Sequence, residues 1–401
     1  MGVPPAVLAE LRAAAAAAGV RRLAIVGGAV RDGLLHQHYG WSLSGKTDWD
    51  WVVEGDVLRL AVELSQRCGV KRVTELQEYE TFGTVALRLD GLPLDLAMAR
   101  RETYLMPGQN PTVKPGSLES DLVRRDFTIN AMAQDLISGN LIDPYHGQRD
   151  LAAGRLVFLS DRSVSDDPTR VVRAARYAAR LGFVLAPEAR QQVIDTVRRW
   201  PWSWHWYDTP EYAPPTLASR MRMELDRLLE KEPWREALDL LEDWQAMSLL
   251  DPVLQGDLDR ARRLRWAQRL KIPLLPAWLA AASIPEAVAR RLCCPGQQQQ
   301  WLRQLKLLKE WLSSGGAPSV DASPAVWTAA LEDQNWMPET VALMVCLKPR
   351  QWKPLLRWWG RWRRLRAPKT AQDLMAAGWL SGPGLGTELR RLRLELLGRS
   401  R

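Results

Sequence analysis

Short apolar runs separated by glycine and polar residues fill the first hundred positions of the chain. Their lengths and residue types predict strands at residues 23–26, 48–53, 84–89 and 92–97. Between them, apolar residues spaced by three and four positions predict helices at 29–35 and 57–68. This alternation predicts an α+β domain at the N-terminal end of the chain.

From residue 122 onwards the pattern becomes that of consecutive amphipathic helices. They are predicted at 167–181, 187–199, 217–229 and 233–247, and further helices broken by proline and glycine follow residue 251. Residues 103–118 are rich in proline, glycine and polar types, which predicts a mobile loop. We therefore expect an α+β domain at 1–155 and mostly α-helical domains at 156–250 and 251–401.

Length and charge narrow the class of protein. The chain has 401 residues, too many for one ordinary core, and a formal net charge of +9 in which arginine dominates. Such a charge favours a polyanionic partner, either a nucleic acid or an anionic membrane surface. Because no apolar run is long enough to span a bilayer and the four cysteines are scattered, we expect a cytoplasmic protein outside the membrane.

Two acidic residues lie at alternate positions of one predicted strand. Asp48 and Asp50 should project from one face, while Trp49 and Trp51 point to the other face, where they can pack. Adjacent carboxylates repel each other unless a cation lies between them. Two-metal nucleotidyl transfer uses such a pair, so Asp48 and Asp50 are predicted to be catalytic metal ligands. Asp95 is either a third catalytic carboxylate or an ordinary residue at a strand edge.

A glycine turn precedes these acids in the same strand–turn–helix unit. Gly27 and Gly28 offer backbone amides at the start of a helix, where a phosphate can bind. The motif lacks the lysine of a P-loop and the third glycine of a dinucleotide fingerprint. A plain turn with a surface pair between Arg31 and Asp32 is the alternative, and the nearby acid pair favours the phosphate site.

Residues 124–132 place two cations, an acid and an amide within two predicted helical turns. Arg125 can hold a triphosphate and Asp126 a ribose, with Asn130 on the same helical face four residues after Asp126. The alternative is a helix start capped by Asp126. The density of polar side chains in so short a segment favours nucleotide binding.

A carboxylate and a guanidinium three residues apart, Asp167 and Arg170, open another predicted helix. Cytosine and adenine present an amino donor beside a ring-nitrogen acceptor, whereas uracil and guanine present the opposite pattern. The carboxylate–guanidinium pair would therefore accept C and A and reject U and G. The alternative is a helix start with Asp167 as its cap. The same face continues with Arg173 and Arg176, candidates for nucleotide binding, and Arg180, which can follow an RNA backbone.

Near the C-terminus, basic residues alternate with tryptophans from residue 348 to 366. This mixture suits RNA, because cations bind phosphates and aromatic rings stack on bases. A packed helix with a charged outer face is the alternative. The candidate RNA-binding residues are Lys348, Arg350, Lys353, Arg357, Arg361, Arg363 and Arg364.

Five segments together resemble one known family, the class II tRNA nucleotidyltransferases with the bacterial poly(A) polymerases. They are GGAVRD from residue 27, the Asp48/Asp50 pair, RRDFTINAMA from 124, DPYHGQRDL from 143 and DDPTRVVRAAR from 166. The resemblance runs from about residue 23 to 183, and a weaker neck-like motif follows at 220–225. One departure is Asp166, since the family usually has glutamate there.

The resemblance implies a nucleotidyltransferase head followed by a helical neck, body and tail. The implied reaction is template-independent addition of C and/or A to the 3′ end of tRNA, with CTP and ATP as substrates. Asp48 and Asp50 are implied to hold Mg²⁺. The other implied roles are triphosphate binding by Gly27, Gly28 and Arg31, phosphate and ribose binding by Arg124, Arg125, Asp126 and Asn130, and base reading by Asp167 and Arg170.

Several products and two other classes of protein stay open. The motifs do not separate CCA addition from CC addition, A addition or poly(A) addition. Family members that stop after CC are shortened in the loop at 103–118, and its length here argues against CC addition alone. A non-catalytic RNA-binding protein would not need the acid pair, and a dinucleotide-binding oxidoreductase would not need RRD. Neither the oligomeric state nor the role of the tryptophan-rich segment 200–215 follows from the sequence.

Overall fold

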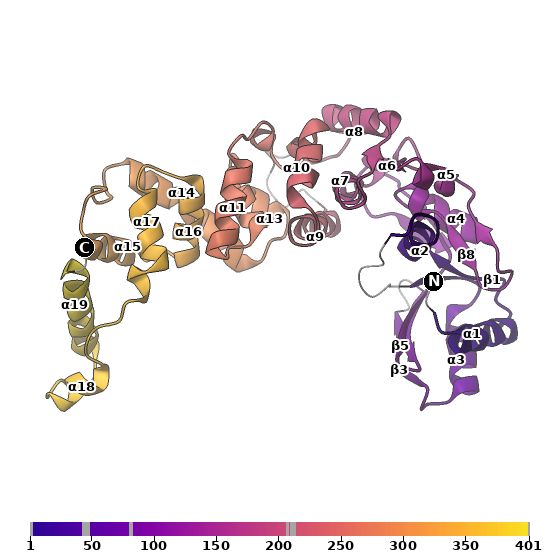
Figure 1. Cartoon of the computed structure of the whole chain (residues 1–401), viewed down its shortest axis with the longest axis horizontal. Helices are drawn as coiled ribbons and strands as arrows, with labels where there is room; N and C mark the ends of the chain where they lie inside the picture. Colours follow the sequence, from indigo (N-terminus) through magenta and orange to yellow (C-terminus); the bar gives the residue numbers. More distant parts are fainter. Residues whose placement is uncertain (1–2, 42–48, 80–82, 206–207, 209–213, 400–401) are drawn as a thin grey trace. The chain divides into compact units, whose positions relative to one another are not determined.

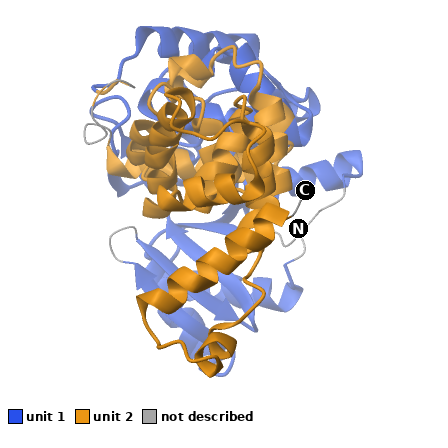
Figure 2. Ribbon diagram, turned by 90° about the vertical axis from the view of Figure 1, so that its left-hand side faces the viewer, with its two compact units in different colours: residues 1–203, 236–246 blue, residues 204–235, 247–401 orange. Residues whose placement is uncertain are grey.

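The computed structural model describes residues 3–41, 49–79, 83–205, 208 and 214–399 (Figure 1). Contacts divide the chain into two compact units, Met1–Ser203 with Glu236–Ala246, and Trp204–Arg235 with Met247–Arg401 (Figure 2). The functional division at 1–155, 156–250 and 251–401 stays a prediction. No helix among the described residues is long and apolar enough to cross a membrane.

All strands of the described chain lie in the first unit. They are β1 (Arg22–Val26), β2 (Asp50–Glu54), β3 (Val73–Tyr79), β4 (Thr84–Leu89), β5 (Leu92–Met98), β6 (Arg100–Thr103), β7 (Thr112–Pro115), β8 (Ala133–Asp135), β9 (Leu141–Ile142), β10 (Arg155–Leu156) and β11 (Val184–Leu185). The helices of this unit are α1 (Pro5–Ala18), α2 (Gly28–Tyr39), α3 (Val57–Cys68), α4 (Leu118–Val123), the 3-10 helix η2 (Thr128–Asn130), α5 (Gly147–Ala152), α6 (Ser163–Asp166), α7 (Thr169–Leu181), α8 (Pro187–Arg199) and most of α10 (Trp234–Asp243).

The second unit is helical in its described residues. It contains α9 (Pro215–Lys231), α11 (Arg260–Leu270), α12 (Leu274–Leu279), α13 (Pro285–Arg291), α14 (Gly296–Ser313), α15 (Pro324–Asp333), α16 (Pro338–Leu347), α17 (Trp352–Gly360), α18 (Ala371–Ala376) and α19 (Pro383–Arg399), with short 3-10 helices η4 (Ala246–Leu249), η5 (Pro252–Leu254) and η6 (Trp362–Arg364). The predicted fold class, an α+β head followed by helices, is therefore confirmed.

Seven strands form one mixed sheet in the order β3-β4-β5-β2-β1-β8-β9. Strand β2 pairs antiparallel with β1 and parallel with β5. In β5, Leu94 and Leu96 are fully buried while Asp95 between them is exposed. Because side chains alternate along a strand, α3, which packs on β4 and β5, covers the face opposite to Asp95. Helix α1 lies beside α3 (Figure 1).

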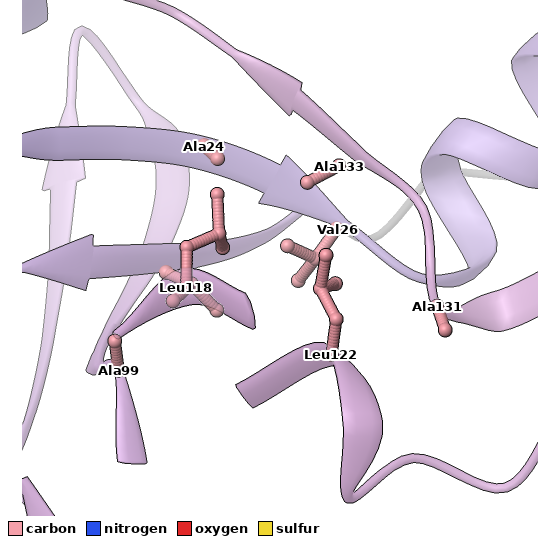
Figure 3. Close-up of a cluster of buried hydrophobic side chains, with 8 residues drawn as sticks. Ala24, Val26, Ala99, Leu118, Leu122, Ala131 and Ala133 are labelled. Carbon is pink, nitrogen blue, oxygen red and sulfur yellow. The ribbon is translucent and has the colours of Figure 1, made fainter. Parts of the chain in front are cut away.

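The other face of the sheet is covered in its middle by the short helix α4. Val26 of β1 and Val52 of β2 pack against Leu118 and Leu122 of this helix (Figure 3). Small side chains complete the cluster and allow the helix to approach closely: Ala24, Ala99, Ala131 and Ala133. Asp50 lies two residues before Val52 and therefore on the face that α4 covers.

Three local expectations were wrong. Strand β3 was missed because only Val73 in it is buried, so this edge strand has no apolar alternation. Residues 103–118 are not irregular throughout, since β6 and β7 pair as a hairpin, with Gly108 at a positive φ of 71° in the connection. Residues 124–132 are not two α-helical turns, because the buried run Ala131–Ala133 leads directly into β8.

Removing the anchor of α4 should destabilise the first unit. Leu122 is fully buried, so Leu122→Ala should lower the free energy of unfolding by about 2–4 kcal/mol through the cavity it leaves. Val123 is 40% exposed, and Val123→Ala should cost less than about 1 kcal/mol. Urea denaturation of both variants measures the difference, and equal losses would contradict the anchoring role of Leu122.

Candidate active site

The acid pair on the described part of the sheet is formed by Asp50 and Asp95. They are register partners on the adjacent parallel strands β2 and β5, and both side chains are exposed. Register partners face the same way, so the two carboxylates share one face of the sheet. Asp50 also pairs in register with Val26, the residue before Gly27. The acids therefore lie next to the glycine turn.

Asp48 lies outside the described residues, and so does the start of the predicted strand 48–53. Within the described residues, no group of three acidic, histidine or cysteine side chains is arranged to hold a metal ion. Asp50 is one of the two predicted metal ligands, and Asp95, the candidate third carboxylate, lies beside it; carboxylate oxygens are the ligands that Mg²⁺ prefers. Trp51 is 1% exposed, so this tryptophan packs on the opposite face as expected.

Gly27 is required at the turn by its backbone and by its neighbour. Its φ is 71°, a left-handed conformation that favours glycine. A Cβ at this position would lie 2.7 Å from Nη1 of Arg125. The guanidinium of Arg125 therefore occupies the space beside the turn that a side chain at residue 27 would fill, and α2 begins immediately afterwards at Gly28.

A carboxylate that the sequence analysis missed orients both neighbouring arginines. Asp121 is fully buried, and its Oδ1 accepts hydrogen bonds from Nε and Nη2 of Arg124 at 2.9 and 2.7 Å. Its Oδ2 accepts from Nη2 of Arg125 at 3.1 Å. Glu102 of β6 also pairs with Arg124, at 3.2 Å. The spacing of three and four residues between Asp121 and the arginines could have indicated these ion pairs from the sequence.

Asp126 joins two segments instead of presenting its carboxylate to solvent. It is 6% exposed, and its Oδ2 pairs with Arg173 of α7 at 2.6 Å. Its Oδ1 accepts from the backbone of Phe127 and from Nδ2 of Asn130, each at 2.9 Å. Burial alone would raise the pKa of Asp126, but Arg173 and Asn130 outweigh burial and hold this pKa below its usual value.

Arg31 is a buried member of the same network. It is 3% exposed and donates from Nη1 to Oδ1 of Asn130 and from Nε to Oδ1 of Asp32, both at 2.7 Å. The pair between Arg31 and Asp32 therefore joins a buried guanidinium to a carboxylate whose side chain is 41% exposed. Asn130 connects Arg31 to Asp126, so the predicted meeting of Asn130 with Asp126 occurs, although on a 3-10 turn.

The proposed base-reading pair lies at the start of α7. Asp167 and Arg170 are both 8% exposed. Asp167 Oδ1 accepts from the backbone N–H and Oγ1 of Thr169 at 3.0 and 2.6 Å, so its carboxylate binds the first amide of α7, although Pro168 is the N-cap residue. Arg170 donates from Nη2 to the carbonyl oxygen of Arg124 at 2.7 Å. This contact links α7 to the segment after α4.

The C-terminal basic segment has its charges outside and its tryptophans inside. Trp358, Trp359 and Trp362 are at most 9% exposed, which leaves these three rings unable to stack on RNA bases, whereas Trp352 of the same segment is half-buried. The residues on the outer face are exposed, at Lys348, Arg350, Lys353, Arg357, Arg361 and Arg364. Arg363 differs, because its guanidinium lies 4.1 Å from the centroid of the Trp359 ring and donates to the Trp359 carbonyl.

Comparison with known proteins gives matches over the head and over the whole chain. Residues 23–157 match the family described as the poly A polymerase head domain. An A-adding tRNA nucleotidyltransferase of Aquifex aeolicus is 46% identical over 170 residues, covering 41% of this chain. The chain spans only 19% of the length of that relative.

Two relatives match over nearly the full length of this chain. A CC-adding tRNA nucleotidyltransferase of Deinococcus radiodurans is 33% identical over 92% of this chain and 83% of its own length. A CCA-adding enzyme of Pseudomonas putida is 31% identical over 93% and 96%. The fold is that of a solved CCA-adding enzyme in an apo form, with a TM-score of 0.73 at 23% identity, covering 100% of this chain and 94% of that one. On these matches, the chain belongs to the family of class II tRNA nucleotidyltransferases.

Proposed function

We propose that the protein adds C and/or A to the 3′ end of tRNA from CTP and ATP without a nucleic-acid template. The observation that carries this proposal is the contact of Arg170 with the Arg124 carbonyl. It brings the base-reading pair to the segment proposed to bind phosphate, within one compact unit. One nucleotide can therefore contact both.

The arrangement supports a direct transfer of the nucleotidyl group. The terminal 3′-hydroxyl of tRNA attacks the α-phosphate, a new phosphodiester bond forms, and the bond to pyrophosphate breaks. Arg124 and Arg125, aligned by Asp121, are placed to stabilise negative charge on the phosphates. Asp50 and Asp95, with Asp48, would hold Mg²⁺, which supplies Lewis-acid stabilisation of the phosphoryl oxygens when bound.

Addition of C is supported by the two relatives that match nearly all of this chain, since both are named for a product that contains C. The Aquifex relative, which covers 41% of this chain, is named for A addition, so A addition alone stays an alternative. The length of segment 103–118 argues against CC addition alone, whereas the Deinococcus relative is named for CC addition. Poly(A) addition stays the alternative within the family. The exposed basic face of α17 suits a tRNA substrate. A cytoplasmic location, which we propose for this protein, suits the same substrate.

The first experiment identifies the product. Purified protein is incubated with tRNAs that end before C, after C and after CC, with each NTP separately and with Mg²⁺. We expect CTP to extend the first two substrates, and ATP addition to the third would establish a complete CCA product. Asp50→Asn should abolish extension and retain tRNA binding, whereas Asp90→Asn, an exposed acid paired with Arg72, should remain active. Extension of unrelated RNA by ATP alone would instead support a poly(A) polymerase.

A second prediction concerns the turn at Gly27. Gly27→Ala should displace the Arg125 guanidinium and weaken CTP binding about tenfold, since a charge-assisted contact to phosphate is lost. Gly19→Ala is the control for adding a side chain at a positive φ. Gly19 has the same φ of 71° and a Cβ there meets no atom within 4 Å, although its ψ is 28° and that of Gly27 is −131°. Equal CTP affinity in the two variants, measured by titration calorimetry, would show that Arg125 does not contribute.

A third prediction separates base reading from helix capping at Asp167. Asn is also a good helix cap, so Asp167→Asn should preserve the melting temperature while replacing an acceptor with a group that can also donate. Preference for CTP over UTP should fall roughly tenfold or more, and Arg170→Ala should lose it similarly. Asp195→Asn, on α8 of the same unit, should change neither property. Unchanged selectivity in both test variants would remove the base-reading role.

A further inference from the structure

One aromatic ring in the first unit is surrounded by four guanidinium groups. The Cζ atoms of Arg31 and Arg180 lie 5.0 and 4.9 Å from the centroid of the Tyr177 ring, and those of Arg173 and Arg176 lie 5.6 and 6.0 Å from it. Three of these arginines belong to α7, as does Tyr177 itself. Arg31 belongs to α2, the helix that follows the glycine turn.

The Tyr177 ring completes a closed series of side-chain contacts, here called the circuit. Arg31 donates to Asn130, Asn130 donates to Asp126, Asp126 pairs with Arg173, and Arg173 and Arg31 both lie beside the Tyr177 ring. The circuit includes side chains of α2, of the 126–130 segment and of α7. Removing the Tyr177 ring leaves the contacts of Asn130 with Arg31 and of Asp126 with Arg173 possible. It removes, however, the ring through which Arg31 contacts α7.

The ring of Tyr177 is shared by all four guanidinium groups, and its hydroxyl adds contacts to two of them. Arg173 Nη2 lies 3.4 Å from the hydroxyl, which is long for a hydrogen bond. Burial alone would lower the pKa of Arg31, but the Tyr177 hydroxyl and Asp32 outweigh burial and raise it. The negative face of an aromatic ring attracts guanidinium groups at the distances found here. Phe127 fixes the ring by an edge-to-face contact at 5.8 Å, and Phe158 stacks on Phe127 at 5.3 Å.

We propose that Tyr177 is a positioning residue that sets the distance between the triphosphate end and the base end of the nucleotide site. The proposal rests on the proposed function above. The glycine turn and α2 lie at one end, and Asp167, just before α7, and Arg170 of α7 lie at the other. A whole nucleotide must contact both ends of the site at once, so its affinity depends on the distance between them. The affinity of a ligand that contacts one end alone does not depend on that distance. Tyr177 therefore acts on the affinity for CTP through the arrangement of the arginines and not by touching the base.

The test compares ligands of two lengths on three variants of the full chain. Binding of CTP and of inorganic tripolyphosphate is measured by calorimetry with Mg²⁺ and without tRNA, alongside KM and kcat for CTP. We expect Tyr177→Leu to weaken CTP binding and raise KM about tenfold, with tripolyphosphate affinity within twofold of wild type. Tyr177→Phe, which keeps the ring, should restore both CTP values to within twofold of wild type.

Phe158→Leu is the matched control for packing. It removes an aromatic ring from the other side of Phe127 without touching the arginines, so it should lower the melting temperature as Tyr177→Leu does while leaving CTP affinity unchanged. Equal loss of CTP and tripolyphosphate affinity in Tyr177→Leu, or no loss of either, overturns the spacing role while the proposed function stands. A wild-type protein that does not bind CTP overturns the proposed function and this inference with it.

Discussion

The ion pair between Asp126 and Arg173 is the interaction on which the arrangement of the candidate site depends. It joins the segment after α4 to helix α7 at 2.6 Å, and the Asp126 carboxylate is almost completely removed from water. Breaking such a pair by removing one partner leaves a buried charge uncompensated, which is far more costly than losing an exposed pair. Asp167 and Arg170, the proposed base-reading residues, lie beside and on the same helix, so this pair and the contact of Arg170 with the Arg124 carbonyl together fix their position relative to Arg124.

Buried acids align arginines in several places of the first unit. Asp121 orients Arg124 and Arg125, and Asp126 orients Arg173. Each guanidinium would otherwise move over several rotamers, and its ordering on binding would reduce affinity for an anion. Fixing the guanidinium groups during folding transfers that entropic cost from ligand binding to the folded state. The sheet contributes the acids Asp50 and Asp95 on rigid neighbouring strands, which serves the same purpose.

Much of this arrangement could be predicted from the sequence, because local patterns specify it. The strands β1, β2, β4 and β5 and the helices α7 and α8 have strong apolar periodicity, and the acids of β2 and β5 follow from alternation along a strand. Asp121 could have been found from its spacing to Arg124, but a lone acid in a short helix reads as an ordinary surface residue. Tyr177 could not be found, since its four guanidinium neighbours include Arg31, which is distant in sequence. The tryptophans of the C-terminal segment misled the prediction because composition does not reveal which face of a helix is buried.

The Arg125 guanidinium occupies the space that a side chain at position 27 would need, which limits the residues that related sequences can have there. A guanidinium end group fills the position of the missing side chain, and the positive φ of Gly27 disfavours a side chain there independently. A shorter residue at position 125 would remove the clash with an alanine at 27 but would leave the backbone strain, whereas glycine at 27 leaves position 125 free to become smaller. We therefore expect related sequences to keep glycine at 27 even where position 125, almost a hundred residues away, has changed. The constraint between the two positions acts in one direction, through excluded volume and without any attraction between the two residues.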